Sequence, residues 1–229
     1  MSYGVDTDEL LQRIMDIQKG VLDISRLNID SLPPLPDTTR VLICSYSTIK
    51  EIPSLPASLQ RLECNDTPLK ELPELPDSLI FLDCSTTDLK KLPSLPDSLQ
   101  ILYCYNTFIT RLHALPPRLE ILSCYNTDID FIDFLPQTLK LLSCNNTPLD
   151  SLPDLPKGLM VLCCDNTRIK IMPELPDNLE VLNCSGCPLI IKYTENDCIH
   201  TYNQRWKNWR NTHSISLWHN VIHSVNKIF

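Results

Sequence analysis

Cysteines are the residues of this chain best suited to chemistry, because thiolates are nucleophiles and metal ligands. The sequence holds eleven of them. Near its end a Cys-x-x-Cys pair is followed by a Cys-x-His pair, the donor types of structural zinc sites: Cys184, Cys187, Cys198 and His200. The first two also occupy regular columns of a sequence repeat, which accounts for them without a metal. We therefore assign no metal and no cofactor, and zinc at these four residues stays an open alternative.

Eight cysteines recur at intervals of 20 residues, from Cys44 to Cys184. This column lies two residues after a column of leucines, from Leu42 to Leu182, so both columns should face one interior. A free cysteine packs as a small hydrophobe, and we expect these thiols to be buried and inert. Cys163 lies outside the column, on the other side of its strand, and is predicted to be the thiol that an alkylating probe reaches most easily.

Motifs that would support catalysis are not found in the sequence. It contains no glycine-rich phosphate loop, no Gly-x-Ser-x-Gly elbow and no His-Glu-x-x-His zinc motif. Four of its five histidines lie after residue 199. We expect that the chain is not an enzyme.

The element that must position all of these residues is a 20-residue repeat. It runs from Leu32 to Ile191, eight times without an insertion or deletion. A fixed period of this length, with leucines at constant offsets, is typical of a solenoid in which each unit buries its apolar face against its neighbours. The predicted fold class is a mostly β repeat solenoid with a curved parallel sheet on its concave face and helical caps at both ends.

Each unit divides into a strand half and a proline half. Alternation places Leu62 and Cys64 on one side of a short strand and Glu63 on the other. The other half, Leu-Pro-x-Leu-Pro, excludes an internal helix because two prolines three apart remove donors and clash with the preceding turn. We therefore expect an extended, Pro-rich convex side. The first proline is replaced by His113 and Asp133, where the pattern loosens.

The chain before the repeats, residues 1–20, is predicted to form an N-terminal helical cap. A helix over 6–19 would begin with a capping box of Asp6 and Glu9 and would end at Gly20. Its apolar face would comprise Leu10, Leu11, Ile14 and Ile17.

The solenoid is assigned to 21–191, a half-unit followed by eight full units. Residues 192–229 are predicted to form a C-terminal helical cap, because their aromatic and aliphatic residues recur at helical spacing. The alternative is a binding segment around Trp206 and Trp209, which carries basic residues nearby.

The run Leu59-x-x-Leu62-x-Cys64-x-x-Thr67-x-Leu69 matches the leucine-rich repeat signature, with threonine in the asparagine position. With its Leu-Pro-x-Leu-Pro half, the unit resembles the short leucine-rich repeats of secreted bacterial effectors, such as Yersinia outer protein M and the Shigella and Salmonella ubiquitin-ligase effectors. The cysteine-bearing units are also similar to leucine-rich repeat proteins of giant viruses. The resemblance implies a protein-binding solenoid, as in a pathogen or viral effector acting on host proteins.

The same resemblance does not extend to ubiquitin-ligase activity. In those ligases the catalytic cysteine, in a domain after the repeats, is followed by aspartate. Here Cys198 is followed by Ile199 and His200. We therefore do not transfer that activity to this chain.

The net charge of −8 is unevenly distributed. The segment after residue 187 contains five basic and two acidic residues and is therefore net positive. The negative charge lies in the part of the chain that contains the repeats. This argues against a broad nucleic-acid-binding face on the repeats. The first 20 residues lack the apolar run of a secretory signal, and no stretch has the length of a membrane span. We expect a cytoplasmic chain, of the producing or the host cell, that does not bind membranes.

The strand side that faces away from the core is the surface on which the units differ. Its first position is apolar in seven of eight copies, which predicts a partner surface, with coverage of these aliphatics at the sheet edge as the alternative. Tyrosines cluster at one place on it, and tyrosine is typical of binding hot spots. The predicted partner-binding residues are Phe81, Asp83, Ile101, Tyr103, Tyr105, Ile121, Ser123, Tyr125, Leu141 and Asn145.

These residues predict a non-enzymatic protein-protein interaction module that binds a protein partner on its concave face. One alternative is a self-assembling structural protein, in which the same face joins copies of the chain into a homo-oligomer. Another is an adaptor of a ubiquitin ligase, which would use the C-terminal tryptophan segment to recruit the ligase.

Overall fold

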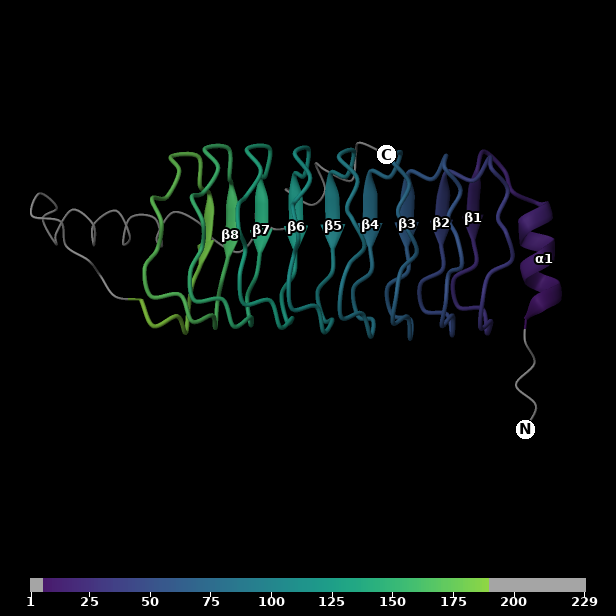
Figure 1. Ribbon diagram of the computed structural model, residues 1–229, viewed down its shortest axis with the longest axis horizontal. Helices are drawn as coiled ribbons and strands as arrows, with labels where there is room; N and C mark the ends of the chain where they lie inside the picture. Colours follow the sequence, from purple (N-terminus) through teal and green to yellow (C-terminus); the bar gives the residue numbers. More distant parts are fainter. Residues whose placement is uncertain (1–5, 190–229) are drawn as a thin grey trace, which may run out of the picture. The chain divides into compact units, whose positions relative to one another are not determined.

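The computed structural model describes residues 6–189. They form one short helix, α1 (Thr7–Met15), and nine parallel strands that lie side by side in chain order (Figure 1). The strands are β1 (Val21–Asp23), β2 (Val41–Ile43), β3 (Arg61–Glu63), β4 (Phe81–Asp83), β5 (Ile101–Tyr103), β6 (Ile121–Ser123), β7 (Leu141–Ser143), β8 (Val161–Cys163) and β9 (Val181–Asn183). This part of the chain is a parallel β-solenoid of about eight turns.

Each strand pairs with the next at a constant offset of 20 residues. Leu42 lies opposite Leu62, and the same pairing continues to Leu162 opposite Leu182. A constant register keeps each sequence column on the same side of the sheet in every turn. The predicted parallel sheet is confirmed.

The interior consists of the leucine and cysteine columns. From Leu42 to Leu162 and from Cys44 to Cys164, every member of the two columns is 0% exposed. The thiol of Cys44 donates to the carbonyl oxygen of Glu63 at 3.3 Å, and burial raises its pKa to about 12. These cysteines are buried in protonated form, as the column predicted.

The connections that carry the prolines contain no helix between β1 and β9. Each has a tight turn in which the N–H of a leucine, or of Thr39 in the first unit, donates to the carbonyl oxygen of the second proline, as from Leu59 to Pro56 at 3.0 Å. The hydroxyl of Ser78 then donates to the carbonyl oxygen of Leu59 at 2.6 Å, which links the turn to the preceding unit. These connections agree with the expected extended, Pro-rich side.

The third residue after each of the nine strands has a positive φ, a feature that sequence reasoning missed. Asn106, Asn126, Asn146 and Asn166 have φ values of 53°, 52°, 54° and 54°. Asparagine tolerates this left-handed region better than most residues. The Nδ2 groups of Asn126, Asn146 and Asn166 donate to the Oδ1 of the asparagine one turn before, at 2.8, 2.6 and 2.8 Å, in an exposed ladder. The ladder ends at Gly186, where a Cβ would lie 2.3 Å from Oδ1 of Asn166.

The N-terminal helix is shorter than predicted. It spans Thr7–Met15, and the expected capping box is wrong because the side chain of Asp6 makes no capping hydrogen bond. The Oδ2 of Asp6 instead accepts the N–H of Asn28 at 2.9 Å, which ties the start of the helix to the first turn. Leu10 is buried, whereas Leu11 is 47% exposed, so only part of the predicted apolar face is covered.

Gly20 does not end the helix, because it lies several residues beyond it, directly before β1. It has a φ of 76°, and a Cβ there would lie 2.6 Å from the carbonyl oxygen of Thr38. Its own carbonyl oxygen accepts the N–H groups of Arg40 and Val41, at 2.7 and 3.0 Å. Glycine is required here by the left-handed backbone and the close approach of the next turn.

The predicted C-terminal cap, residues 192–229, lies outside the described residues. Trp206, Trp209, Cys198 and His200 lie there too, so neither the tryptophan segment nor the zinc alternative is tested by the structure. The boundaries predicted for the two caps and the solenoid stay predictions.

Candidate partner-binding face

The side of the sheet that faces away from the leucine and cysteine columns is called the sheet face below. In each unit the first and third strand residues and the second residue after the strand point to it. The predicted site residues all lie on this face, at β4 to β7. Five of them are buried: Phe81, Ile101, Ile121, Ser123 and Leu141. Five keep part of their surface exposed: Asp83, Tyr103, Tyr105, Tyr125 and Asn145.

The apolar stripe predicted as a partner surface is covered in its middle turns. Ile101, Ile121 and Leu141 are 3%, 2% and 4% exposed. Parallel strands lie only about 4.8 Å apart, so each of these side chains is flanked by the same column of both neighbouring turns. These aliphatics are buried, as the alternative expected, but they lie in the middle turns of the sheet and not at its edge. They support the surface and offer little area for direct contact.

Four aromatic rings form a continuous row across this part of the sheet face. Phe81 meets Tyr103 edge to face, with centroids 5.6 Å apart and an interplanar angle of 86°. Tyr103 lies 6.5 Å from Tyr105, and Tyr105 stacks on Tyr125 at 4.4 Å and 7°. Aromatic pairs of this kind contribute about 0.5–1.5 kcal/mol beyond the area they bury. These four residues, called the aromatic row, therefore hold one another in fixed orientations.

Arg61 lies at the N-terminal end of the aromatic row. Its guanidinium carbon is 3.8 Å from the centroid of the Phe81 ring, and its Nε donates to Oε1 of Glu63 at 2.7 Å. A cation between a ring face and a carboxylate is stabilised by both. Sequence reasoning left Arg61 out of the site. The sequence does contain a signal for it, because Arg61 is the one basic residue in the column of first strand positions, which is otherwise apolar.

Asp83 is the acidic group beside the aromatic row. Its Oδ1 accepts the N–H and the hydroxyl of Ser85, at 3.1 and 2.5 Å. Burial raises the pKa of Asp83, the two hydrogen bonds from Ser85 oppose that rise, and the negative charge of Glu63 adds to it. The carboxylate is therefore less well stabilised than it would be in water.

The tyrosines of the aromatic row share this environment. Burial raises the pKa of Tyr103, and the charge of Asp83 adds to the rise. Burial likewise raises the pKa of Tyr105 and, with the neighbouring Tyr105, that of Tyr125 to about 12. All three phenols are therefore neutral at physiological pH.

Cys163 is buried, so the prediction that it is the most accessible thiol is wrong. It lies on the sheet face but is 2% exposed. Its sulfur accepts a hydrogen bond from Nδ2 of Asn183 at 3.5 Å. Burial raises the pKa of Cys163 to about 12. Among the cysteines within 6–189, Cys184 and Cys187 are the more exposed ones.

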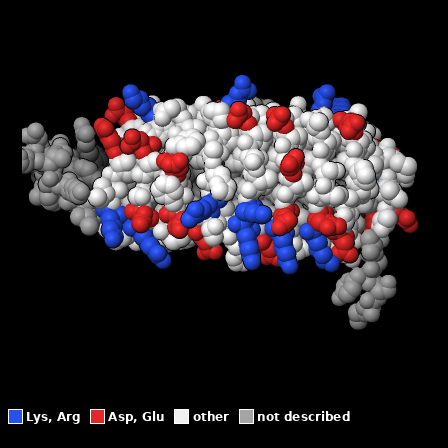
Figure 2. Space-filling model, viewed as in Figure 1, with Lys and Arg blue, Asp and Glu red and all other residues white. Residues whose placement is uncertain are grey.

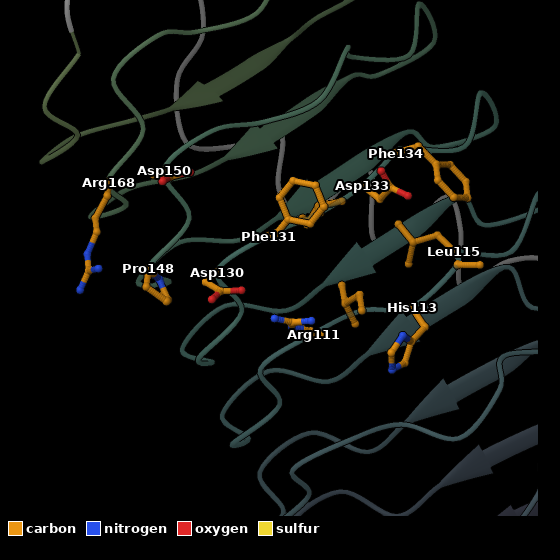
Figure 3. Close-up of a pocket in the computed structure, with 13 residues that line it drawn as sticks. Arg111, His113, Leu115, Asp130, Phe131, Asp133, Phe134, Pro148, Asp150 and Arg168 are labelled. Carbon is orange, nitrogen blue, oxygen red and sulfur yellow. The ribbon is translucent and has the colours of Figure 1, made fainter.

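A second surface feature lies where the prolines are missing. Residues of the connections after β5 and β6 line a hollow of about 740 Å³, with Pro148, Asp150 and Arg168 at one end (Figure 3). Phe131 and Phe134 line it and are 56% and 44% exposed. In most other units the same two positions are polar or charged. Sequence reasoning noted the irregular units but placed no site residue in this hollow, called the phenylalanine groove.

Charged side chains follow the edges of the solenoid. In Figure 2 the lysines and arginines lie along the two long edges, with few in the band between them. Some pair with acids of the neighbouring turn, as Lys50 with Asp30 and Lys140 with Glu120, each at 2.7 Å. In the phenylalanine groove, within the described residues, Arg111 makes no such ion pair.

Within residues 6–189 no group of three or more histidine, cysteine, aspartate or glutamate side chains is arranged to hold a metal ion. Cys187 is engaged locally, since its thiol donates to the carbonyl oxygen of Cys164 at 3.0 Å. In the same part of the chain no helix has the length and apolarity needed to cross a bilayer.

Solved structures of leucine-rich repeat proteins are similar to this solenoid. YopM from Yersinia enterocolitica WA-314 is 32% identical over 76% of this chain and 44% of its own, with a TM-score of 0.62. A Shigella effector leucine-rich repeat domain is 28% identical over 76% of this chain and 71% of its own, with a TM-score of 0.56. No protein-family model matches the sequence, and no curated protein matches it significantly.

The stacked strands, the leucine columns and these similarities define the class of the protein. It is a leucine-rich repeat solenoid with repeats of about 20 residues. More particularly, it is similar to YopM and to the repeat domain of a Shigella effector. The chain spans less than half of the YopM chain that it matches.

Proposed function

We propose that this protein is a non-enzymatic protein-interaction module that binds a protein partner through the sheet face, at the aromatic row. The observation that carries the proposal is the continuous contact of four rings, three of which keep accessible surface. Tyrosine gives a large, rigid contact area with a polar tip, which is why it is enriched in binding hot spots.

The rings are also ordered before any partner arrives. Tyr105 and Tyr125 are stacked, and Phe81 is fixed between Arg61 and Tyr103. A preformed surface loses less side-chain entropy on binding, so more of the contact energy contributes to affinity. The similarity to bacterial effector repeats supports a further proposal, that the partner is a protein of a host cell.

The test is replacement of Tyr103, Tyr105 and Tyr125 by alanine. The triple variant should lose at least nine-tenths of the partner captured from host lysate, since hot-spot tyrosines contribute about 2 kcal/mol or more, with an unchanged circular dichroism spectrum. The matched control replaces Phe131 and Phe134 by alanine, which removes two exposed rings elsewhere and should leave capture intact. Full capture by the tyrosine variant would contradict the proposal.

Self-assembly through the same face is distinguished by light scattering. A monomer at all accessible concentrations excludes a homo-oligomer as the main role of the aromatic row. Concentration-dependent growth that disappears in the tyrosine variant would replace the proposal by self-assembly.

A further inference from the structure

Two neighbouring turns of the solenoid, at β3 and β4, can be compared to find what kind of side chain a partner would place on the sheet face. At β3 the solenoid binds one of its own arginines: the guanidinium of Arg61 lies over the ring of Phe81, in the next turn, and bonds to the carboxylate of Glu63 in its own turn. The arrangement thus consists of an acid, a cation and a ring from the following unit.

One turn further along, the acid recurs in its column and an aromatic ring lies beside it, although the column of Phe81 holds Ile101 there. Asp83 lies opposite Glu63 in the strand register, and Tyr103 lies opposite Asp83 in the following unit. The ring of Tyr105 lies next to that of Tyr103, with centroids 6.5 Å apart. The position that corresponds to Arg61 is occupied by Phe81, whose ring packs on Tyr103. Within the described residues, Asp83 has no ion-pair partner.

We propose that an arginine of the protein partner binds beside Asp83 and over the rings of Tyr103 and Tyr105, so that a carboxylate and aromatic rings hold it, as Glu63 and Phe81 hold Arg61 in the preceding turn. This inference rests on the proposed function and specifies the chemistry of the same site. Arginine fits better than lysine because a planar guanidinium can stack on a ring while it bonds to a carboxylate.

The charges around Asp83 favour such a ligand. On the sheet face the described acids are Asp23, Glu63, Asp83 and Asp165, and the described base is Arg61. Arg61 is already bonded to Glu63. A second cation would therefore meet net negative charge and relieve the repulsion between Asp83 and Glu63.

The chain provides a matched control at another turn of the same face. Oδ1 of Asp165 accepts the N–H of Ser185 in the next turn at 2.8 Å, and Oδ1 of Asp83 accepts the N–H of Ser85 in its own turn at 3.1 Å, so each carboxylate has one backbone donor. The corresponding ring positions near Asp165 hold no aromatic residue, since the neighbours along the rows are Asn145, Asn183 and Ser185. Asp165→Asn thus removes an equivalent charge without touching the proposed site.

The experiment titrates the full chain, labelled with ¹³C in its tyrosine rings, with acetyl-Gly-Gly-Arg-Gly-Gly-amide and follows the ring signals by NMR. We expect saturable shifts of Tyr103 and Tyr105, with affinity in the range of about 1 mM for one side chain. Citrulline in place of arginine, or Asp83→Asn in the protein, should weaken binding at least tenfold, and lysine about threefold. Asp165→Asn should leave binding unchanged.

Equal binding of the citrulline peptide, or unchanged binding by the Asp83→Asn variant, would overturn the arginine assignment. So would the absence of saturable shifts at these tyrosines. If capture of a protein partner still depends on the tyrosines in that case, the proposed function stands and only the arginine is wrong. If capture is also independent of the tyrosines, both proposals fall.

Discussion

The aromatic row and the phenylalanine groove lie on neighbouring turns of one solenoid, yet their rings are held in opposite ways. Phe81 is 3% exposed and contacts a guanidinium and a tyrosine ring. Phe131 is 56% exposed, and no ring contact is found for it within residues 6–189. The difference shows that the position within the repeat unit, more than the residue type, decides whether a ring is part of a fixed surface.

The physical reason is the spacing of the strands. A sheet-face residue has the same column of the next turn about 4.8 Å away on each side, so aromatic residues in successive units must pack on one another. A residue in the connection at Phe131 lies where the chain lacks the first proline, beside His113 and Asp133. The sheet face therefore presents rings that are ordered before binding, whereas the two phenylalanine rings of the groove are exposed beside charged side chains.

The largest effect that we predict from this comparison is on the alkylation rate of Cys163, which lies on the sheet face. Its pKa is raised by burial to about 12, so at pH 8 its thiolate fraction should be about a thousandfold below that of a free thiol. We expect Cys163 to stay unmodified by iodoacetamide in the native chain while Cys187 reacts, as mapped by mass spectrometry. Alkylation of Cys163 as fast as Cys187 would show that the sheet face is open at β8.

The next effect is on stability. Phe81→Ala should lower the free energy of unfolding by about 3 kcal/mol, because it leaves a cavity and removes the ring contacts of Arg61 and Tyr103. Phe131→Ala should change it by less than about 0.5 kcal/mol, as is usual for an exposed site. Urea unfolding of the two variants measures the difference. Equal losses would remove the distinction between the two regions.

A smaller effect, which depends on pH, tests the electrostatics of the sheet face. The pKa of Asp83 is raised, so the folded chain holds this proton more tightly than the unfolded chain does. Its contribution to stability is complete below the ordinary aspartate pKa of about 3.9 and is lost as the pH rises through the raised value. Asp83→Asn should therefore gain stability relative to the wild type between pH 4 and pH 7 in urea titrations. A gain that does not vary with pH would contradict the raised pKa.

The fold could be predicted from the sequence because each column repeats many times. The leucines from Leu42 to Leu182 and the cysteines from Cys44 to Cys184 indicated which residues of each strand face the interior. The prolines excluded helices from the connections. The left-handed column could also have been found, because asparagine at 106, 126, 146 and 166 followed by Gly186 is typical of a position that requires positive φ.

The site was harder to predict, because burial on the sheet face depends on neighbours in adjacent turns. Ile121 and Cys163 point away from the core in the alternation pattern, yet both are 2% exposed. The contact of Arg61 with Phe81 joins residues 20 positions apart and follows from the register. The predicted capping box of α1 was wrong because the carboxylate of Asp6 accepts the N–H of Asn28 in the first turn, a tertiary contact that local capping rules do not include.

The most direct measurement is hydroxyl-radical footprinting of the chain with and without its captured partner. If the sheet face is the contact surface, Tyr103, Tyr105 and Tyr125 lose most of their reactivity in the complex, while Phe131 and Phe134 keep theirs. Protection of the two phenylalanines with unchanged tyrosines would contradict the proposal and would assign recognition to the phenylalanine groove.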